Sequence, residues 1–146
     1  MTVLNEELSL LPQQWAKEFI GSPQKKLILQ GTRLCKRVSN STSYNRLSPW
    51  WMLKSDWDLQ NQRSAGMGVS PADLARARQA VRNDWQGNLD QVVHGQLMQS
   101  VFGWVGQTRW QPLDSSDPKV VLIGGGQQVC IPNLTDTHIR VVHAAS

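Results

Sequence analysis

The sequence predicts an α+β fold, with helices in its first part and strands in its second part. Two observations lead to this prediction. Apolar residues recur at helical spacing in two segments before Gly87, and short apolar segments separated by glycine, proline and polar turns follow it. Helices that precede strands, and do not alternate with them, favour α+β over a parallel α/β sheet. The 146 residues, 40% of them hydrophobic and 18% charged, are expected to form one globular domain over 1–146.

Residues 1–22 are expected to form a helical lead-in. Pro12 is suited to start a second helical piece, and the sequence Gly21-Ser22-Pro23 ends the lead-in. The apolar residues of this segment lie at near-helical spacing: Leu8, Leu10, Leu11, Trp15, Phe19 and Ile20.

The segment that follows changes from an extended pattern to a polar one. Residues 25–38 indicate a strand, or a strand pair bent at Gly31. Residues 39–47 are a polar loop by composition, and residues 48–69 show no clear periodicity. A connection is therefore expected between this strand region and the next helix.

The clearest helix begins after Ser70. Ser70 is a favourable N-cap, Pro71 fits the first helical position, and Asp73 stands at the third, as in a variant of the capping box. One apolar face is expected from the residues Leu74, Ala77, Val81 and Trp85.

The second half of the chain predicts five short strands. They are expected near residues 91–98, 101–110, 119–123, 127–132 and 137–143. The sequence Gly124-Gly125-Gly126 is followed by another strand and not by a helix, so it predicts a turn and not a phosphate-binding loop.

Composition narrows the classes of function. The net charge of +4 and the pI of about 9.4 suit a nucleic acid or a phosphate-bearing ligand.

No apolar run approaches the roughly 20 residues of a transmembrane helix, so no membrane association is expected. The N-terminus lacks a secretory signal, which predicts a cytoplasmic protein or an effector exported by a route that needs no signal.

No metal site is expected either. Cys35 and Cys130 are 95 positions apart without a CxxC motif, which predicts a thiol pair in neighbouring strands. His138 and His143 differ by five positions, so they should lie on opposite faces of one strand.

The candidate binding residues lie in the first half. Period-2 alternation places Arg33, Cys35 and Arg37 on one face of a strand. Trp50 and Trp51 follow Ser48 and Pro49, and adjacent tryptophans are not easily buried on one face, so one of them is expected to line a cleft. Two other tryptophans, Trp104 and Trp110, are expected in the core.

The end of the sequence resembles the ADP-ribosyltransferase superfamily, in particular its small bacterial toxins and effectors. The residues that carry the resemblance are Val129-Cys130-Ile131-Pro132-Asn133, the final segment Thr137-His138-Ile139-Arg140-Val141-Val142, and the early segment LCKRVS. The resemblance implies a strand-rich, two-sheet catalytic-type core over residues 25–143, with NAD as the substrate.

The resemblance also assigns roles to residues of this chain. Arg37 is the best match for the arginine that contacts a phosphate of NAD, and Arg33 is the second. Ser48 beside Trp50 and Trp51 matches the serine and aromatic wall for nicotinamide, with Ser43 as a competitor. Gln128 stands where the family has its catalytic glutamate, with Gly126 two positions before it.

A glutamine at that position changes the expected chemistry. Gln128 can form a hydrogen bond with a ribose hydroxyl but cannot act as a carboxylate, and no glutamate lies beyond Glu18. Three interpretations stay open: the chemistry tolerates an amide, the acid comes from elsewhere, or the domain binds without catalysis. Gln107 and Gln111 are further polar candidates near the late strands.

The favoured hypothesis is an NAD-binding toxin or effector. It would cleave the nicotinamide–ribose bond and transfer ADP-ribose to an unknown acceptor, which is a macromolecule, a small molecule or water, with Arg37 and Gln128 as catalytic residues. A cognate immunity or target protein is a possible partner of such a protein. The alternatives are a non-catalytic protein-interaction module, such as an inhibitor or adaptor, and a single-stranded nucleic-acid binder.

Overall fold

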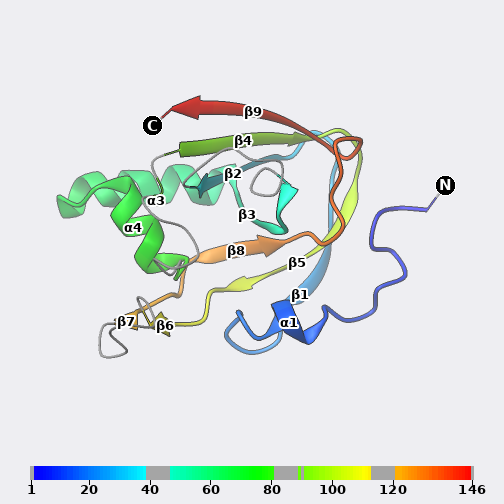
Figure 1. Ribbon diagram of the computed structural model, residues 1–146, viewed down its shortest axis with the longest axis horizontal. Coiled ribbons are helices and arrows are strands. Elements are labelled where there is room, and N and C mark those ends of the chain that lie inside the picture. The colour runs from blue at the N-terminus through cyan, green and yellow to red at the C-terminus, as the bar shows by residue number, and fades with distance from the viewer. Residues whose placement is uncertain (1, 39–46, 81–88, 90, 113–120, 146) are drawn as a thin grey trace.

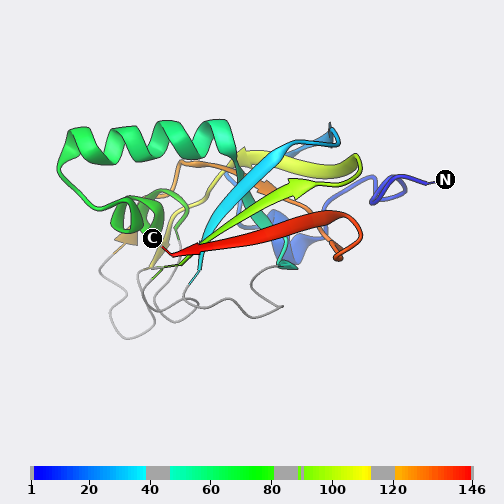
Figure 2. The same ribbon diagram turned by 90° about the horizontal axis from the view of Figure 1, so that it is seen from above.

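The computed structural model describes residues 2–38, 47–80, 89, 91–112 and 121–145, and every structural statement below concerns those residues. They form an α+β fold built on a seven-stranded sheet with the strand order β1-β5-β8-β3-β2-β4-β9. All neighbouring strands are antiparallel. Figures 1 and 2 show the helices α3 and α4 together at one end of the molecule, opposite the N-terminus.

The expected helical lead-in is mostly wrong. The structure has one short helix there, α1 (Gln13–Ala16), which begins directly after Pro12 as the sequence predicted. On either side of α1 the chain forms bridges to the strand β5 region instead, from Leu4 to Val101 and from Phe19 to Thr108. Phe19 is buried through this pairing, so sheet contacts override the helical spacing of the apolar side chains.

The region 25–38 forms two strands, β1 (Gln24–Ile28) and β2 (Arg33–Val38). Gly31 lies in the turn between them with φ +90°, a conformation that favours glycine. The two strands do not pair with each other, because β1 pairs with β5 whereas β2 pairs with β3 and β4.

The segment without periodicity contains two regular elements, the strand β3 (Trp50–Leu53) and the helix α3 (Lys54–Met67). The helix escaped prediction because its buried residues are Trp57, Gln60 and Ser64, which form no apolar stripe. It ends at Gly68, which has the left-handed conformation typical of a helix C-terminus.

The next helix, α4 (Pro71–Arg78), begins as predicted. The Ser70 side chain accepts a 3.0 Å hydrogen bond from the Asp73 backbone N–H, and Pro71 occupies the first turn. Leu74 is buried and Ala77 is half-buried, whereas the predicted positions Val81 and Trp85 lie outside the described residues.

All five strands predicted in the second half are present. They are β4 (Gln91–Leu97), β5 (Val101–Gln107), β7 (Val121–Leu122), β8 (Gln127–Cys130) and β9 (Ile139–Ala145). A further short strand, β6 (Gln111–Pro112), pairs with β7 in a two-stranded ribbon. The triple-glycine segment is a turn, as predicted, between β7 and β8.

Where two sheets were expected, the seven strands form one sheet with two halves. One half is β1-β5-β8, the other is β2-β4-β9, and β3 joins them through two residue pairs on each side. Leu34, Val93, Val129 and Ile131 from both halves meet in the main core. Cys35 in β2 and Cys130 in β8 are both free and buried, but β3 lies between their strands, so they are not in neighbouring strands as expected.

Candidate functional site

A cavity of about 470 Å³ opens where β2 and β3 separate from each other. The β2–β3 pairing covers only Leu34 with Leu53 and Cys35 with Met52, so the strand ends beyond these pairs diverge and leave room between the two halves of the sheet. The cavity brings together five residues singled out from the sequence: Arg37, Ser48, Trp50, Trp51 and Gln128.

Arg37 lies at the end of β2 and enters the cavity next to α3. Its guanidinium carbon is 5.3 Å from the centre of the Trp57 ring, and its Nη1 donates to the Leu89 carbonyl at 3.3 Å. Its Nε is buried without a hydrogen-bond partner in the described structure. Burial lowers the pKa of Arg37, although an arginine side chain keeps its charge at neutral pH. The side chain therefore presents an unsatisfied, charged donor.

Trp50 and Trp51 are consecutive residues of β3, so their side chains point to opposite faces of the sheet. Trp50 is half-buried and packs at a ring-centroid distance of 5.7 Å from Phe19. Trp51 points to the other face, into the main core, where it is only 2% exposed. Its Nε1 is nevertheless buried without a partner in the described structure. Trp50 is therefore the ring that is accessible to a stacked ligand, and Trp51 contributes a donor that lacks an acceptor.

Gln128 on β8 contacts the backbone of Glu18, a residue of the N-terminal region that also lines the cavity. Its Nε2 donates at 3.2 Å to the backbone carbonyl of Glu18, which also accepts at 2.8 Å from the Arg109 N–H. The Glu18 side chain accepts a hydrogen bond from Gln111. Glu18 is the one acidic side chain among the described residues that line the cavity. The cavity therefore contains one carboxylate, that of Glu18, in addition to the Gln128 amide.

Ser48 contacts a buried lysine that the sequence analysis did not select. Lys36 Nζ lies 2.8 Å from Ser48 Oγ and 3.2 Å from the Ser48 carbonyl oxygen, to which it donates. It also lies 3.9 Å from the centre of the Trp51 ring. A signal for Lys36 was present in the sequence, because period-2 alternation gives it the same inward face as Leu34 and Val38.

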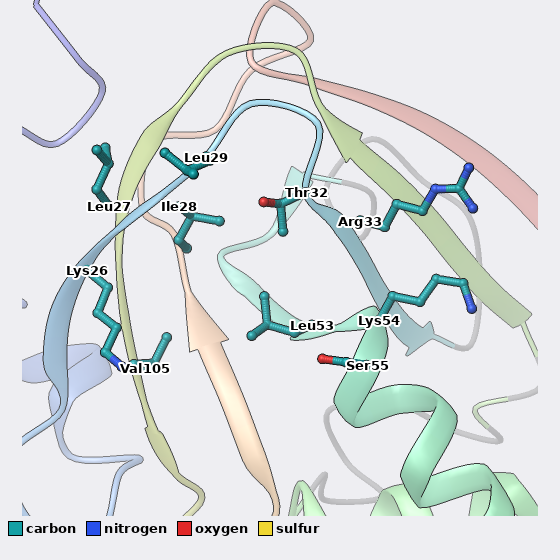
Figure 3. Close-up of a pocket in the computed structure, with 10 residues that line it drawn as sticks. All are labelled: Lys26, Leu27, Ile28, Leu29, Thr32, Arg33, Leu53, Lys54, Ser55 and Val105. Atoms are coloured by element: carbon teal, nitrogen blue, oxygen red, sulfur yellow. The ribbon is translucent and has the colours of Figure 1, made fainter.

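Arg33 does not reach this cavity. It lines a separate and more open depression of about 480 Å³, between β1 and the start of α3, together with Leu27, Leu29 and Lys54. In Figure 3, Arg33 and Lys54 extend to the same side of this depression. The position of Ser43, the competitor of Ser48, lies outside the described residues. Of the two candidate arginines, Arg37 alone lines the cavity that holds Ser48 and Gln128.

The electrostatic balance of the cavity favours an anion. The ionisable side chains among its described lining residues are Lys17, Glu18, Lys36 and Arg37, which is three basic groups against one acidic group. Two further lining residues, Ala80 (φ +48°) and Leu89 (φ +52°), have left-handed backbones that cost about 1 kcal/mol each. Such strain is typical of functional sites.

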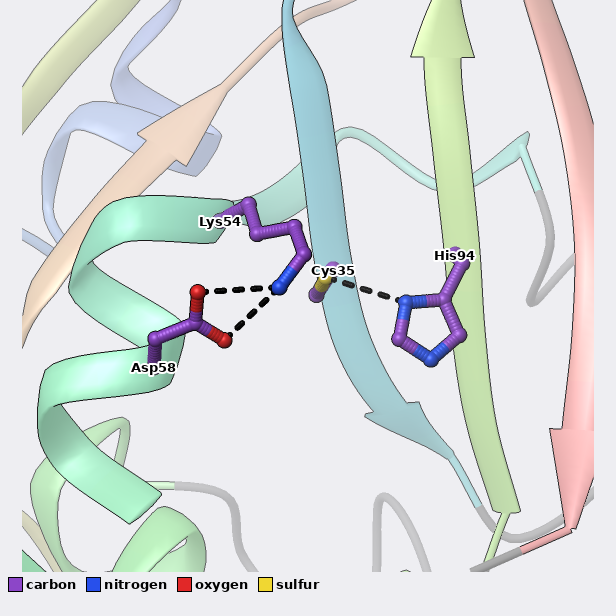
Figure 4. A network of polar contacts seen from close by, with 4 residues as sticks. All are labelled: Cys35, Lys54, Asp58 and His94. Atoms are coloured by element: carbon purple, nitrogen blue, oxygen red, sulfur yellow. Dashed lines mark hydrogen bonds and ion pairs between the residues drawn. The ribbon is translucent and has the colours of Figure 1, made fainter. Parts of the chain in front are cut away.

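A second polar cluster, formed by Cys35, Lys54, Asp58 and His94, lies outside the cavity (Figure 4). Cys35 Sγ and His94 Nδ1 are 3.3 Å apart, next to the ion pair of Lys54 with Asp58. Burial raises the pKa of the Cys35 thiol to about 11, so it is protonated at neutral pH and a poor nucleophile.

The remaining histidine and tryptophan expectations have mixed outcomes. His138 precedes β9 and accepts through Nδ1 from the Thr135 N–H, so it does not share a strand with His143 as expected. Trp104 is buried as predicted, whereas Trp110 is 55% exposed, which is a correction.

No group of three or more metal-ligating side chains occurs among the described residues. In the same part of the chain, no helix is long and apolar enough to cross a bilayer.

The fold is similar to chains in two solved structures. In the complex of Tne2 with Tni2, one chain has a TM-score of 0.55 and 12% identity to this protein, covering 85% of this chain and 92% of that one. In the complex of Rhs1-CT with its cognate immunity protein RhsI1, the TM-score is 0.57 and the identity 14%, covering 87% and 83%. No protein-family model matches the sequence, and no curated protein matches it.

Proposed function

We propose that the cavity binds NAD and that the protein cleaves the bond between nicotinamide and ribose. The observation that carries this proposal is the convergence of five residues on one cavity: Arg37, Ser48, Trp50, Trp51 and Gln128. They come from three separate strand regions, and the sequence resemblance gave each of them a role toward NAD. A volume of about 470 Å³ lies within the range of small-molecule sites.

The diphosphate of NAD would be held by the basic side of the cavity. The Arg37 Nε donor is buried without a partner in the described structure, so a phosphate oxygen would satisfy it. A guanidinium on a strand can form two parallel charge-assisted hydrogen bonds with one phosphate group. The excess of basic over acidic side chains in the lining supports the same assignment.

The nicotinamide ring would stack against Trp50. This ring is half-buried, and its contact with Phe19 fixes its orientation. A flat aromatic wall of this kind is a suitable partner for a nicotinamide ring. Trp51 also lines the cavity, and a carboxamide or ribose oxygen would satisfy its Nε1 donor, which is buried without a partner in the described structure.

The polar wall around Gln128 would stabilise the reacting sugar. When nicotinamide leaves with the electrons of the glycosidic bond, C1 of the ribose becomes cationic, and preorganised negative charge nearby lowers that barrier. We assign this part to the Glu18 carboxylate and assign the binding of a ribose hydroxyl to the Gln128 amide. A water molecule or a nucleophile on an acceptor then bonds to C1 and loses a proton.

The test is calorimetric titration with NAD, with nicotinamide release followed by chromatography. Arg37→Ala is expected to weaken NAD binding at least about tenfold, because a charged hydrogen bond to a phosphate is lost. Arg33→Ala is the matched control, since Arg33 lies on the same strand but lines the other depression. Absence of binding by the unaltered protein at millimolar NAD, or equal loss in both variants, would contradict the proposal.

We further propose that this chain acts as a toxin or effector whose activity a partner protein restrains. The support is the fold shared with chains from complexes, one of which contains a cognate immunity protein. Expression of the chain in bacterial cells is expected to lower their NAD content, whereas the Arg37→Ala variant at equal abundance leaves it unchanged. Unaltered NAD despite a growth defect would instead favour the interaction-module hypothesis.

A further inference from the structure

Lys36 is the most unusual charged residue in the described structure. Its side chain belongs to β2 and borders the cavity, yet it is only 7% exposed. Lysines are almost never buried to this degree without a carboxylate partner, because an ammonium loses its hydration there. The one ion pair found among the described residues is that of Lys54 with Asp58, so Lys36 has none.

Among the described residues, no carboxylate forms an ion pair or a hydrogen bond with Lys36. On one side the amine contacts the Ser48 hydroxyl and carbonyl oxygens, and on another it faces the ring of Trp51. The residue opposite Lys36 on β4 is Val93, which is apolar. The other charged groups around the cavity are Lys17, Glu18 and Arg37. Burial alone lowers the pKa of Lys36 well below its ordinary value.

An anion that enters the cavity would reverse this effect. A phosphate near the amine favours the ammonium form, since an opposite charge within a few ångströms stabilises it. The two hydrogen bonds with Ser48 hold the amine in place before the ligand arrives. The aromatic face of Trp51, at 3.9 Å, favours the same charged form.

We propose that Lys36 is a second phosphate-binding group of the cavity and that it takes up a proton as the phosphate binds. This inference rests on the proposed function, because it takes the diphosphate of a dinucleotide as the ligand. It assigns Lys36 a role that the sequence resemblance gave to arginine alone. The proton comes from the solvent, and no covalent bond forms or breaks.

The experiment is titration calorimetry with ADP-ribose and, separately, with inorganic pyrophosphate. Each titration is run at one pH in buffers with different ionisation enthalpies, so that the slope of the observed enthalpy gives the number of protons taken up. A positive slope, up to one proton, is expected for the unaltered protein. Lys36→Met is expected to abolish the slope and to weaken binding about tenfold or more.

Two further variants make the outcome specific. Lys36→Arg is expected to retain binding without proton uptake, since a guanidinium is already charged. Lys26→Met, at the other depression, is expected to retain both the slope and the affinity. Thermal denaturation of each variant verifies that it is folded. A zero slope for the unaltered protein, an unchanged slope in Lys36→Met, or no binding of either probe at millimolar concentration would overturn the inference.

The outcome separates this inference from the proposed function. Pyrophosphate binding with proton uptake, without nicotinamide release from NAD, would leave the role of Lys36 intact and refute the enzymatic proposal. Nicotinamide release without proton uptake would do the opposite.

Discussion

At the scale of single residues, Glu18 is the carboxylate best placed to replace the missing glutamate of the late strand. Its backbone is fixed by hydrogen bonds from Gln128 and Arg109, and its side chain by Gln111. Glu18→Gln keeps the shape and removes the charge. We expect nicotinamide release to slow about 100-fold with little change in KM, because the charge acts mainly on the transition state.

The control for this change is Glu7→Gln, which removes a charge from an exposed side chain in the same N-terminal region. Steady-state kinetics on the two variants separate a local effect from a change in net charge. A Glu18→Gln variant with the full rate would show that the amide of Gln128 is sufficient without a carboxylate.

Cavity residues could be predicted from the sequence where they lie on strands whose register the sequence indicates. Arg37, Trp50 and Gln128 could be selected from short segments, and the structure brings them together. Glu18 could not be paired with Gln128 from the sequence, because the two are 110 positions apart and meet through a backbone contact. Lys36 was passed over because a lysine is ordinarily assigned to a solvated face.

At the scale of elements, the triple-glycine turn positions the polar wall of the cavity. Gly124 N–H donates to the Ala77 carbonyl of α4, and Gly126 N–H donates to that of Arg78. Gly124 has φ +70°, and a Cβ there would lie 2.6 Å from the Thr108 carbonyl oxygen. The turn therefore connects the end of α4 to β8, directly before Gln128.

Gly124→Ala is expected to lower the free energy of unfolding by about 2–3 kcal/mol, from the left-handed backbone together with the backbone clash. Gly21→Ala is the matched control, because Gly21 has φ +66° but no atom within 4 Å of its added Cβ. We expect a loss of about 1 kcal/mol there, measured by urea denaturation. Equal losses in the two variants would show that the contact with Thr108 is not significant.

Elements with a distinct sequence pattern were predicted, and elements without one were missed. The cap at Ser70 identified the start of α4, and short apolar segments between glycine and polar turns identified β4 and β5. The helix α3 escaped prediction because Gln60 and Ser64 occupy buried positions, where Gln60 bonds to Gln79. The prediction of a helical lead-in failed for the opposite reason, since its buried residues Leu11 and Phe19 pack against the sheet and do not form one face of a helix.

At the scale of the whole molecule, the stability of the fold is expected to fall in alkaline solution. Burial raises the pKa of Cys35 from 9.0 to about 11, so the unfolded chain releases the thiol proton first. The preference for the neutral thiol contributes fully below pH 9.0 and is lost as the pH rises through about 11. This loss corresponds to about 2–3 kcal/mol for Cys35.

Chemical denaturation at several pH values between 8 and 11 measures this loss. Burial also raises the pKa of Cys130, so that thiol contributes in the same direction. Cys35→Ala is expected to flatten the decline by the contribution of Cys35 and to leave that of Cys130. Parallel pH profiles for the two proteins would show that Cys35 keeps its ordinary pKa in the folded state.

The strand β3 joins the two halves of the sheet through two residue pairs on each side, whereas β4 and β9 share seven. The backbone pairing of β3 with its two neighbours is therefore expected to open at a lower free energy than the pairing in the rest of the sheet. Amide protons of β3 should exchange with deuterated water faster than those of β4. A ligand that contacts Arg37 on one half and Gln128 on the other would hold the two halves together at β3. Its binding would therefore slow amide hydrogen exchange in β3, although β3 carries neither residue.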